Sequence, residues 1–216
     1  MQHRFVTFEG IEGSGKTVVA REVHRAVAAE GPALLLREPG GTAVSEEIRR
    51  LLLDPSRSEI AARTELLLYL ASRAQLVEEV IRPALAEGRS VVCDRYMDAS
   101  VAYQGWARGL GEALVRELNA FTVGGVVPDR TFLLDLPAAE GLARGPARRE
   151  RDGVAAPDRL ERETAQFHEK VREGYLRLAA REHGRIVVVD AARPLEEVLD
   201  VVFRNLSALF GVQLSG

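Results

Sequence analysis

A glycine-rich segment near the start of the chain has the composition and spacing of a phosphate-binding loop. It runs Gly10-Ile11-Glu12-Gly13-Ser14-Gly15-Lys16-Thr17, which fits the pattern Gly-x-x-x-x-Gly-Lys-Thr. Glycines allow successive backbone N–H groups to point at phosphate oxygens, and a following helix adds its positive N-terminus. Lys16 would reach the β- and γ-phosphates, and the Thr17 hydroxyl suits Mg²⁺. We therefore expect this whole segment to bind the phosphates of a nucleotide such as ATP.

Charged side chains follow two further apolar segments. Asp94 and Arg95 end one of them, where a carboxylate can hold Mg²⁺ and a guanidinium can grip a phosphate. Arg37 and Glu38 end the other and precede a Pro-Gly turn. Ligands of parallel α/β sheets gather outside the carboxyl ends of the strands, so these side chains are expected beside the phosphate loop.

The elements that must position these residues follow from the hydrophobic pattern. Five short apolar segments without strict alternation are expected to be buried parallel strands, at 4–9, 33–38, 90–94, 130–135 and 185–190. Helical periodicity follows the first strand and recurs at 60–87, 160–183 and 195–209, with Pro83 as a kink or break in the second. This alternation predicts an α/β P-loop NTPase fold: a five-stranded parallel sheet flanked by helices.

Composition sets the broad class of protein. The chain has 216 residues, of which 46% are hydrophobic and 28% charged, which fits a single domain over 1–216. The net charge of −3 does not favour nucleic acid, and no apolar stretch is long enough to span a bilayer. The single cysteine, Cys93, cannot form an internal disulfide, which suits the cytoplasm. The four histidines are scattered, so a histidine-based metal site is not expected.

One segment differs from the rest of the chain. Residues 144–162 are rich in arginine and contain two glycines and two prolines, which indicates a mobile lid rather than core. A closing lid that carries arginines would exclude water and stabilise the charge of a transferring phosphoryl group.

With these motifs the chain resembles bacterial thymidylate kinases. The matching blocks lie at 8–17, 37–42, 65–73, 94–96, 102–105, 158–161 and 167–175, in family order over nearly the whole chain. The phosphate loop is generic, whereas Arg-Glu-Pro-Gly-Gly and Ala-Tyr-Gln-Gly are specific. The resemblance implies transfer of a phosphoryl group from ATP, with Mg²⁺, to dTMP in dTTP biosynthesis. It also implies a homodimer.

The resemblance implies roles for individual residues. Arg37, Arg49 and Arg95 would lie at the phosphate of dTMP, and Tyr69 would stack on thymine. Arg73, Ser100 and Gln104 would contact the base, and Tyr103 and Glu12 the sugar. Thr17 and Asp94 would hold the metal, with Glu9 in its water network. The residues expected to act in the transfer itself are Lys16, Asp94, Arg95, Arg148 and Arg149.

The position of the catalytic lid arginine stays open at this stage. The phosphate loop lacks an arginine, which is typical of relatives that carry it in the lid, and here the lid offers Arg144, Arg148, Arg149 and Arg151. An insertion at 152–157 shifts the register relative to the common family pattern. We expect Arg148 or Arg149 at the transferred group, and Arg144 against adenine.

Two other functions fit parts of the pattern. Another nucleotide or nucleoside kinase of the P-loop class could share the scaffold. A P-loop regulatory switch would need only the phosphate loop, but a GTPase would be expected to carry Asn-Lys-x-Asp for guanine. Neither lysine in the chain, Lys16 or Lys170, follows an asparagine.

Overall fold

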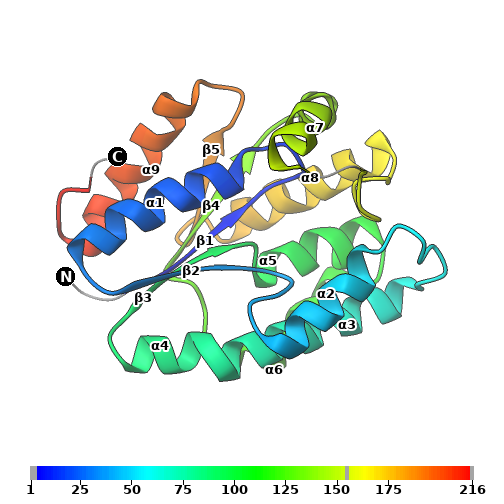
Figure 1. The fold of residues 1–216 in the computed structure, drawn as a ribbon, viewed down its shortest axis with the longest axis horizontal. Coiled ribbons are helices and arrows are strands. Elements are labelled where there is room, and N and C mark those ends of the chain that lie inside the picture. Colours follow the sequence, from blue (N-terminus) through cyan, green and yellow to red (C-terminus); the bar gives the residue numbers. More distant parts are fainter. Residues whose placement is uncertain (1–3, 154–155, 215–216) are drawn as a thin grey trace.

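A five-stranded parallel sheet forms the centre of the molecule, as predicted (Figure 1). The computed structural model describes residues 4–153 and 156–214, without the side chains of residues 148, 149, 151 and 152. The strand order is β2-β3-β1-β4-β5. The strands are β1 (Phe5–Glu9), β2 (Ala33–Arg37), β3 (Ser90–Asp94), β4 (Arg130–Asp135) and β5 (Ile186–Asp190). Each lies within one residue of its predicted bounds.

Helices cover both faces of this sheet (Figure 1). On one face, α1 (Lys16–Glu30) and α9 (Leu195–Phe210) pack on β1, β4 and β5 through aliphatic and phenylalanine side chains. The helices between these two along the chain include α2 (Ala43–Leu53), α3 (Ala62–Leu76), α5 (Met97–Ser100), η2 (Val101–Ala107), α6 (Glu112–Val123), α7 (Ala138–Asp152) and α8 (Ala165–Arg181). The second face is covered mainly by α3, η2, α6 and α8.

The predicted helix at 60–87 continues through Pro83. It consists of α3, a π-helical turn η1 (Val77–Ile81) and α4 (Arg82–Ala86). A proline ring inside a regular α-helix meets the carbonyl four residues earlier. Here the turn just before Pro83 is widened, with the Arg82 N–H bonded to the Val77 carbonyl, so the chain accommodates the ring without a break.

Two further boundaries differ from the prediction. Residues 144–152, expected in a mobile lid, are helical as the second half of α7, which contains Pro146. The predicted helix at 160–183 begins only at Ala165, where Thr164 Oγ1 accepts the N–H of Phe167. Before it, Asp158 Oδ1 accepts the N–H groups of Leu160 and Glu161, which holds a turn instead of a helix.

The pleat of β1 divides its side chains between the two faces. Val6 and Phe8 pack against α1 and α9, whereas Thr7 and Glu9 point to the other face. There Thr7 Oγ1 lies 2.7 Å from Thr131 Oγ1. Glu9, the last residue of the strand, is thereby buried beneath the edge where the phosphate loop begins.

Candidate active site

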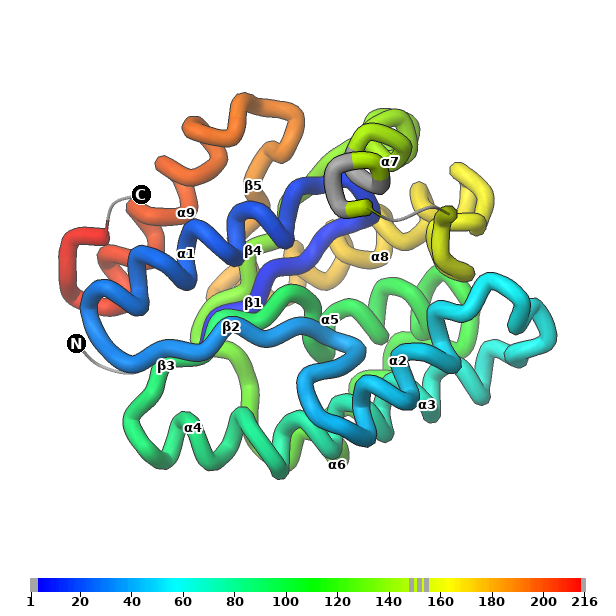
Figure 2. The backbone as a smooth tube through the Cα atoms, in the orientation of Figure 1, coloured from blue at the N-terminus to red at the C-terminus, as the bar shows by residue number. Residues whose placement is uncertain are grey.

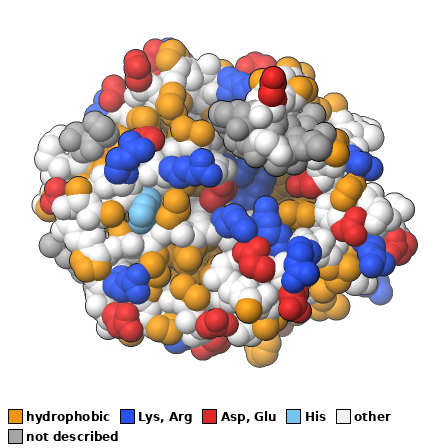
Figure 3. Space-filling model, in the orientation of Figure 1, with side chains coloured by type: hydrophobic (Ala, Val, Ile, Leu, Met, Phe, Trp, Pro, Cys, Tyr) orange, Lys and Arg blue, Asp and Glu red, His pale blue; other side chains and the backbone are white. Residues whose placement is uncertain are grey.

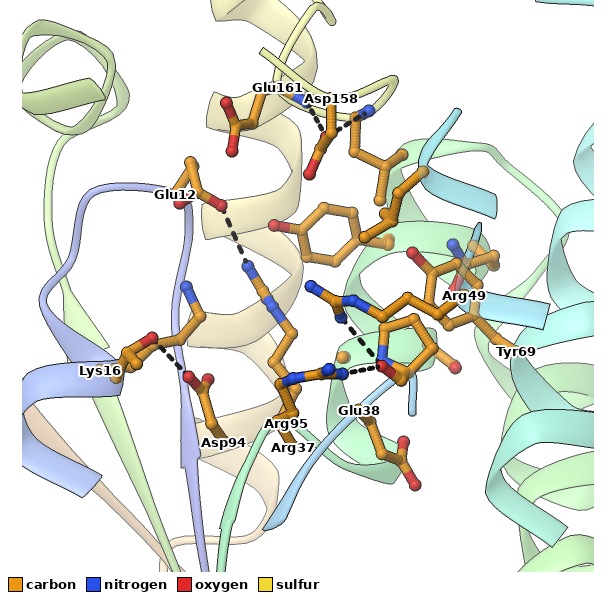
Figure 4. A pocket seen from close by; sticks show the side chains of 18 of the residues that line it. Glu12, Lys16, Arg37, Glu38, Arg49, Tyr69, Asp94, Arg95, Asp158 and Glu161 are labelled. Carbon is orange, nitrogen blue, oxygen red and sulfur yellow. Dashed lines mark hydrogen bonds and ion pairs between the residues drawn. The ribbon is translucent and has the colours of Figure 1, made fainter. Parts of the chain in front are cut away.

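A pocket of about 420 Å³ opens at the carboxyl edge of the sheet, where cationic side chains gather around a hollow (Figure 3). Its wall combines the phosphate loop, the ends of β2 and β3, and the turn before α8 (Figure 4). It is lined by Glu12, Lys16, Thr17, Arg37, Glu38, Pro39, Arg49, Leu53, Tyr69, Asp94, Arg95, Ala99, Ser100, Tyr103, Gln104, Asp158, Leu160, Glu161 and His168.

The phosphate loop joins β1 to α1, as its sequence predicts. Gly15 precedes the helix with a φ of 85°, a left-handed conformation that a residue with a side chain rarely adopts. Lys16 is buried at the start of α1, and its Nζ donates to the Ile11 carbonyl at 3.2 Å. Burial, with the nearby Arg95 cation, lowers the pKa of Lys16 to about 8. The loop therefore holds a cation whose charge is stabilised when an anion arrives.

The loop also packs closely against the first turn of α7 (Figure 2). A Cβ on Gly13 would lie 2.2 Å from the Gly141 carbonyl oxygen, and a Cβ on Gly141 would lie 2.3 Å from the Glu12 carbonyl oxygen. Both positions therefore require glycine. This contact places the helix that carries the lid arginines directly beside the phosphate loop.

Thr17 and Asp94 meet across the strands as a candidate metal pair. Thr17 Oγ1 donates to Asp94 Oδ2 at 2.5 Å. The other carboxylate oxygen, Oδ1, is buried and has no hydrogen-bond partner in the part of the chain that the structure describes. No group of three or more His, Cys, Asp or Glu side chains among the described residues could hold a metal by itself. A hydroxyl and one carboxylate suit Mg²⁺, which takes its remaining ligands from phosphates and water.

Two arginines converge on one backbone carbonyl at the end of β2 (Figure 4). Arg37 Nη1 and Arg49 Nη1 donate to the Pro39 carbonyl at 2.9 Å and 2.8 Å. Burial and the neighbouring Arg37 cation lower the pKa of Arg49. Two guanidinium groups held this close together form a ready site for a phosphate dianion.

Arg95 completes this cationic cluster from the end of β3. Its φ is 70°, and in the described part of the chain it is the only non-glycine residue with a positive φ. Its Nη1 donates to the Gly10 carbonyl at 3.0 Å, and its guanidinium lies 5.1 Å from the centre of the Tyr103 ring. Its Nη2 is 3.7 Å from Glu12 Oε2. Arg95 therefore connects the phosphate loop with the acceptor side of the pocket.

Glu9 lies behind Arg95 and does not line the pocket. Its Oε1 accepts the Tyr96 N–H at 2.7 Å, and its Oε2 accepts the Tyr175 hydroxyl at 2.6 Å. Burial, with the nearby Asp98 carboxylate, raises the pKa of Glu9 to about 8. The structure thus gives Glu9 a buried position within the protein, and its expected role in a metal–water network stays a prediction.

The residues predicted at the base, and Tyr103 predicted at the sugar, lie together with one exception. Tyr69, Ser100, Tyr103 and Gln104 all line the pocket. Arg73 lies behind the wall and is 1% exposed. Its guanidinium makes five contacts of 3.0 Å or less, to Glu38, Ser100, Asn119 and the Tyr96 carbonyl. A direct contact from Arg73 to a base would require one of these bonds to be exchanged.

The lid arginines are only partly described. Arg144, on α7, does not line the pocket; its Nη1 donates to the Ala191 carbonyl after β5 at 3.1 Å. The side chains of Arg148 and Arg149, the predicted catalytic arginines, lie outside the described residues.

Several lining residues were not predicted as site residues. Asp158, Leu160 and Glu161 come from the turn before α8, and His168 from its first turns. The block at 158–161 had matched the family, and that match was the signal that could have identified three of them. His168 is buried, and burial together with the Arg95 cation lowers its pKa. It lies in the block at 167–175, which also matched the family, so the same signal covered it.

The comparisons with known proteins agree with this geometry. A family model described as thymidylate kinase matches residues 8–202. The chain belongs to the thymidylate kinase family. A thymidylate kinase of Desulfosudis oleivorans is 52% identical over 196 residues, covering 90% of this chain and 92% of the relative. A thymidylate kinase of Nitratidesulfovibrio vulgaris is 48% identical over 207 residues, covering 95% of this chain and 96% of the relative.

A solved structure extends the likeness to the fold. The crystal structure of thymidylate kinase from Ehrlichia chaffeensis superposes with a TM-score of 0.76 at 28% identity, covering 95% of this chain and 99% of that one. Membership of this family confirms the predicted P-loop fold and the predicted enzyme class, a kinase that phosphorylates dTMP.

Proposed function

We propose that this thymidylate kinase transfers the γ-phosphoryl group of ATP, with Mg²⁺, to the 5′-phosphate of dTMP in the pocket described above. The observation that carries the proposal is the position of Arg95. One guanidinium bonds the phosphate loop at Gly10 and lines the same pocket as the Arg37–Arg49 pair. A donor phosphate on the phosphate loop and an acceptor phosphate on the arginine pair would then lie close enough to react. Positioning is the main requirement of phosphoryl transfer.

On the donor side, the backbone of the phosphate loop and Lys16 would hold the triphosphate. Thr17 and Asp94 would hold Mg²⁺, which supplies positive charge that neutralises the phosphate oxygens. The buried, unpartnered Asp94 Oδ1 supports this assignment, because a buried carboxylate oxygen without a partner is otherwise unfavourable. Arg148 or Arg149 would add charge from the lid, and Arg144 would lie near the adenine.

On the acceptor side, Arg37, Arg49 and Arg95 would bind the phosphate of dTMP. Tyr69 would stack on thymine, Ser100 and Gln104 would contact its edge, and Tyr103 and Glu12 would lie at the deoxyribose. Arg73 would act through Ser100, to which it donates at 2.9 Å, unless ligand binding releases one of its bonds.

An acceptor panel tests the proposal. Purified protein with ATP and Mg²⁺ is offered dTMP, dUMP, dCMP, AMP and thymidine, and ADP release is followed with each. We expect the highest kcat/KM with dTMP. Preference for another acceptor would support the second candidate, a different P-loop nucleotide kinase. ATP turnover that no acceptor stimulates would indicate a regulatory switch.

We also propose that the chain is one domain and functions as a homodimer in the cytoplasm. All five strands of the one sheet come from successive parts of the chain, which supports the single domain.

Exposed apolar side chains support the homodimer. Leu67 on α3 and Leu114 and Phe121 on α6 are exposed, Phe121 by 86%, and α3 packs against α6. Such apolar side chains suit a subunit interface, and Phe121→Asp should shift sedimentation toward a monomer. Cys93 is a buried free thiol, as is usual in a reducing compartment.

No helix in the described part of the chain is long and apolar enough to cross a membrane.

A further inference from the structure

Glu65 is a buried carboxylate beside the base end of the pocket, and the proposed reaction does not use it. It lies on α3 and is 1% exposed. Its Oε2 lies 3.0 Å from Arg108 Nη2 and 2.7 Å from Arg159 Nη1. Its Oε1 accepts a hydrogen bond of 2.8 Å from the side-chain amide Nε2 of Gln104. Arg108 Nε also donates to Oε1, at 3.2 Å. Two arginine N–H groups therefore meet Oε2, whereas one arginine N–H group and the Gln104 amide meet Oε1.

This bond determines which way round the Gln104 amide lies. Burial opposes ionisation of Glu65, but the bonds from Arg108 and Gln104 outweigh it and hold its pKa below the usual value. Glu65 is thus ionised near neutral pH and can only accept hydrogen bonds. If the amide were turned over, the oxygen Oε1 of Gln104 would face a carboxylate oxygen, which is unfavourable for both.

The free edge of the amide faces the pocket. Gln104 lines the pocket although its residue is 1% exposed, and no donor among the described residues contacts its Oε1. Its second Nε2 hydrogen is also available, because Glu65 accepts only one. The protein therefore presents an acceptor next to a donor, in a fixed order.

We propose that Glu65 is a positioning residue for base selection: by locking the amide of Gln104, it makes the pocket accept a base that offers an N–H beside a carbonyl and reject cytosine. This inference rests on the proposed contact between Gln104 and the base. Thymine and uracil carry N3–H between two carbonyls and match the locked amide. Cytosine in the same stacked position turns an N3 lone pair toward Oε1. An unlocked glutamine could turn over and match cytosine equally well.

The substitution Glu65→Gln tests this inference because Arg108 and Arg159 determine its orientation. Two arginine N–H groups meet the former Oε2 position and only one, from Arg108 Nε, meets the former Oε1 position, so the new amide oxygen is favoured at Oε2. The new amide nitrogen then faces Gln104 and favours the turned-over amide. We expect the ratio of kcat/KM for dTMP to that for dCMP to fall about tenfold. The ratio of kcat/KM for dTMP to that for dUMP should stay unchanged, because thymine and uracil present the same N3–H and carbonyl groups. A general loss of structure would lower kcat/KM for dTMP, dCMP and dUMP by the same factor.

Matched variants separate the possible outcomes. Glu163 also pairs with Arg108, at 2.6 Å, but has no bond to Gln104, so Glu163→Gln should leave the dTMP to dCMP ratio unchanged. Gln104→Met removes the amide itself. If Gln104→Met leaves the ratio unchanged, the proposed base contact is wrong. If Gln104→Met lowers the ratio and Glu65→Gln does not, the base contact stands and the inference about Glu65 is overturned.

A second substitution guards against failure to fold, since Glu65→Gln removes a buried charge from two arginines. Glu65→Asp keeps a negative charge beside Arg108 and Arg159 but draws the carboxylate back by one methylene, out of the 2.8 Å hydrogen bond with Gln104. A lower dTMP to dCMP ratio in this variant supports the inference. If folded Glu65→Asp, which has lost the hydrogen bond from the Gln104 amide, keeps the dTMP to dCMP ratio of the wild type, the inference is overturned.

Discussion

Arg95 Nη1 donates a hydrogen bond of 3.3 Å to the hydroxyl oxygen of Tyr175, across 80 residues of sequence. The same hydroxyl donates to Glu9 Oε2 at 2.6 Å, so Tyr175 holds the arginine and is itself held from the core. Arg95 has a left-handed backbone that is unfavourable for a residue with a side chain, and contacts of this kind must maintain it. The end of β1 and helix α8 thereby determine where the proposed acceptor-phosphate arginine lies.

Removal of the Tyr175 hydroxyl should weaken acceptor binding. In Tyr175→Phe, Arg95 loses one of its fixed contacts, and we expect KM for dTMP to rise roughly threefold to tenfold, about 1 kcal/mol, with a smaller change in kcat. The matched control is Tyr96→Phe, whose hydroxyl donates to the Val126 carbonyl in the core. It should lower stability without a selective effect on KM for dTMP. Equal effects of both variants on KM would contradict a positioning role for Tyr175.

Glu9 should make stability depend on pH in the direction opposite to an ion-paired carboxylate. Its pKa is about 8 in the folded protein against 4.5 for the free group, so the folded state binds the proton more tightly. The stabilisation of the folded state by protonated Glu9 is full below about pH 4.5 and is lost as the pH rises through about 8. Relative to Glu9→Gln, we expect the free energy of unfolding of the wild type to fall by a few kcal/mol over this range. Urea unfolding of both proteins between pH 5 and 9 measures it, and parallel curves would contradict it.

Lys16 should make nucleotide binding pH-dependent. Its pKa of about 8 in the empty pocket means that the ammonium loses its proton as the pH rises through 8. Bound phosphates favour the charged form, so binding takes up a proton near this pH and affinity falls above it. Calorimetric titration with ATP in buffers of different ionisation enthalpy measures the proton uptake. Lys16→Arg, which stays charged, should show none, and equal uptake in both proteins would contradict the assignment.

The Thr17–Asp94 pair should control the response to Mg²⁺. Asp94→Asn keeps the size of the side chain but removes the charge, and we expect kcat to fall on the order of a hundredfold with a higher Mg²⁺ requirement. Thr17→Ser retains the hydroxyl and should keep most activity. Initial rates over a range of Mg²⁺ concentrations at saturating ATP and dTMP measure both effects. An unchanged Mg²⁺ dependence in Asp94→Asn would contradict a metal role for this carboxylate.

The lid should supply the charge that the phosphate loop lacks. We expect Arg148→Ala or Arg149→Ala to lower kcat at least tenfold, about 1.4 kcal/mol. Arg193→Ala, which removes an exposed arginine outside the lid, should have little effect. Steady-state rates with dTMP and ATP measure the three variants. If neither lid substitution lowers kcat tenfold, the catalytic arginine lies elsewhere.

The sequence by itself determined the strands, the phosphate loop and the family. The strands are apolar runs buried on both faces, and the loop needs glycines at set positions, so both leave a local trace. The charged strand ends also pointed to one edge, because parallel strands place their carboxyl ends together.

Only the tertiary structure decided how these residues support one another. Arg73 was expected to contact the base, but Glu38, Ser100 and Asn119 meet its guanidinium behind the wall. The contacts from Arg95 to Tyr175 and from Glu65 to Gln104 join segments far apart in the chain. No periodicity or spacing records such pairs. Hydrogen-bond partners depend on the directions and burial of side chains, which are determined only when the helices pack on the sheet.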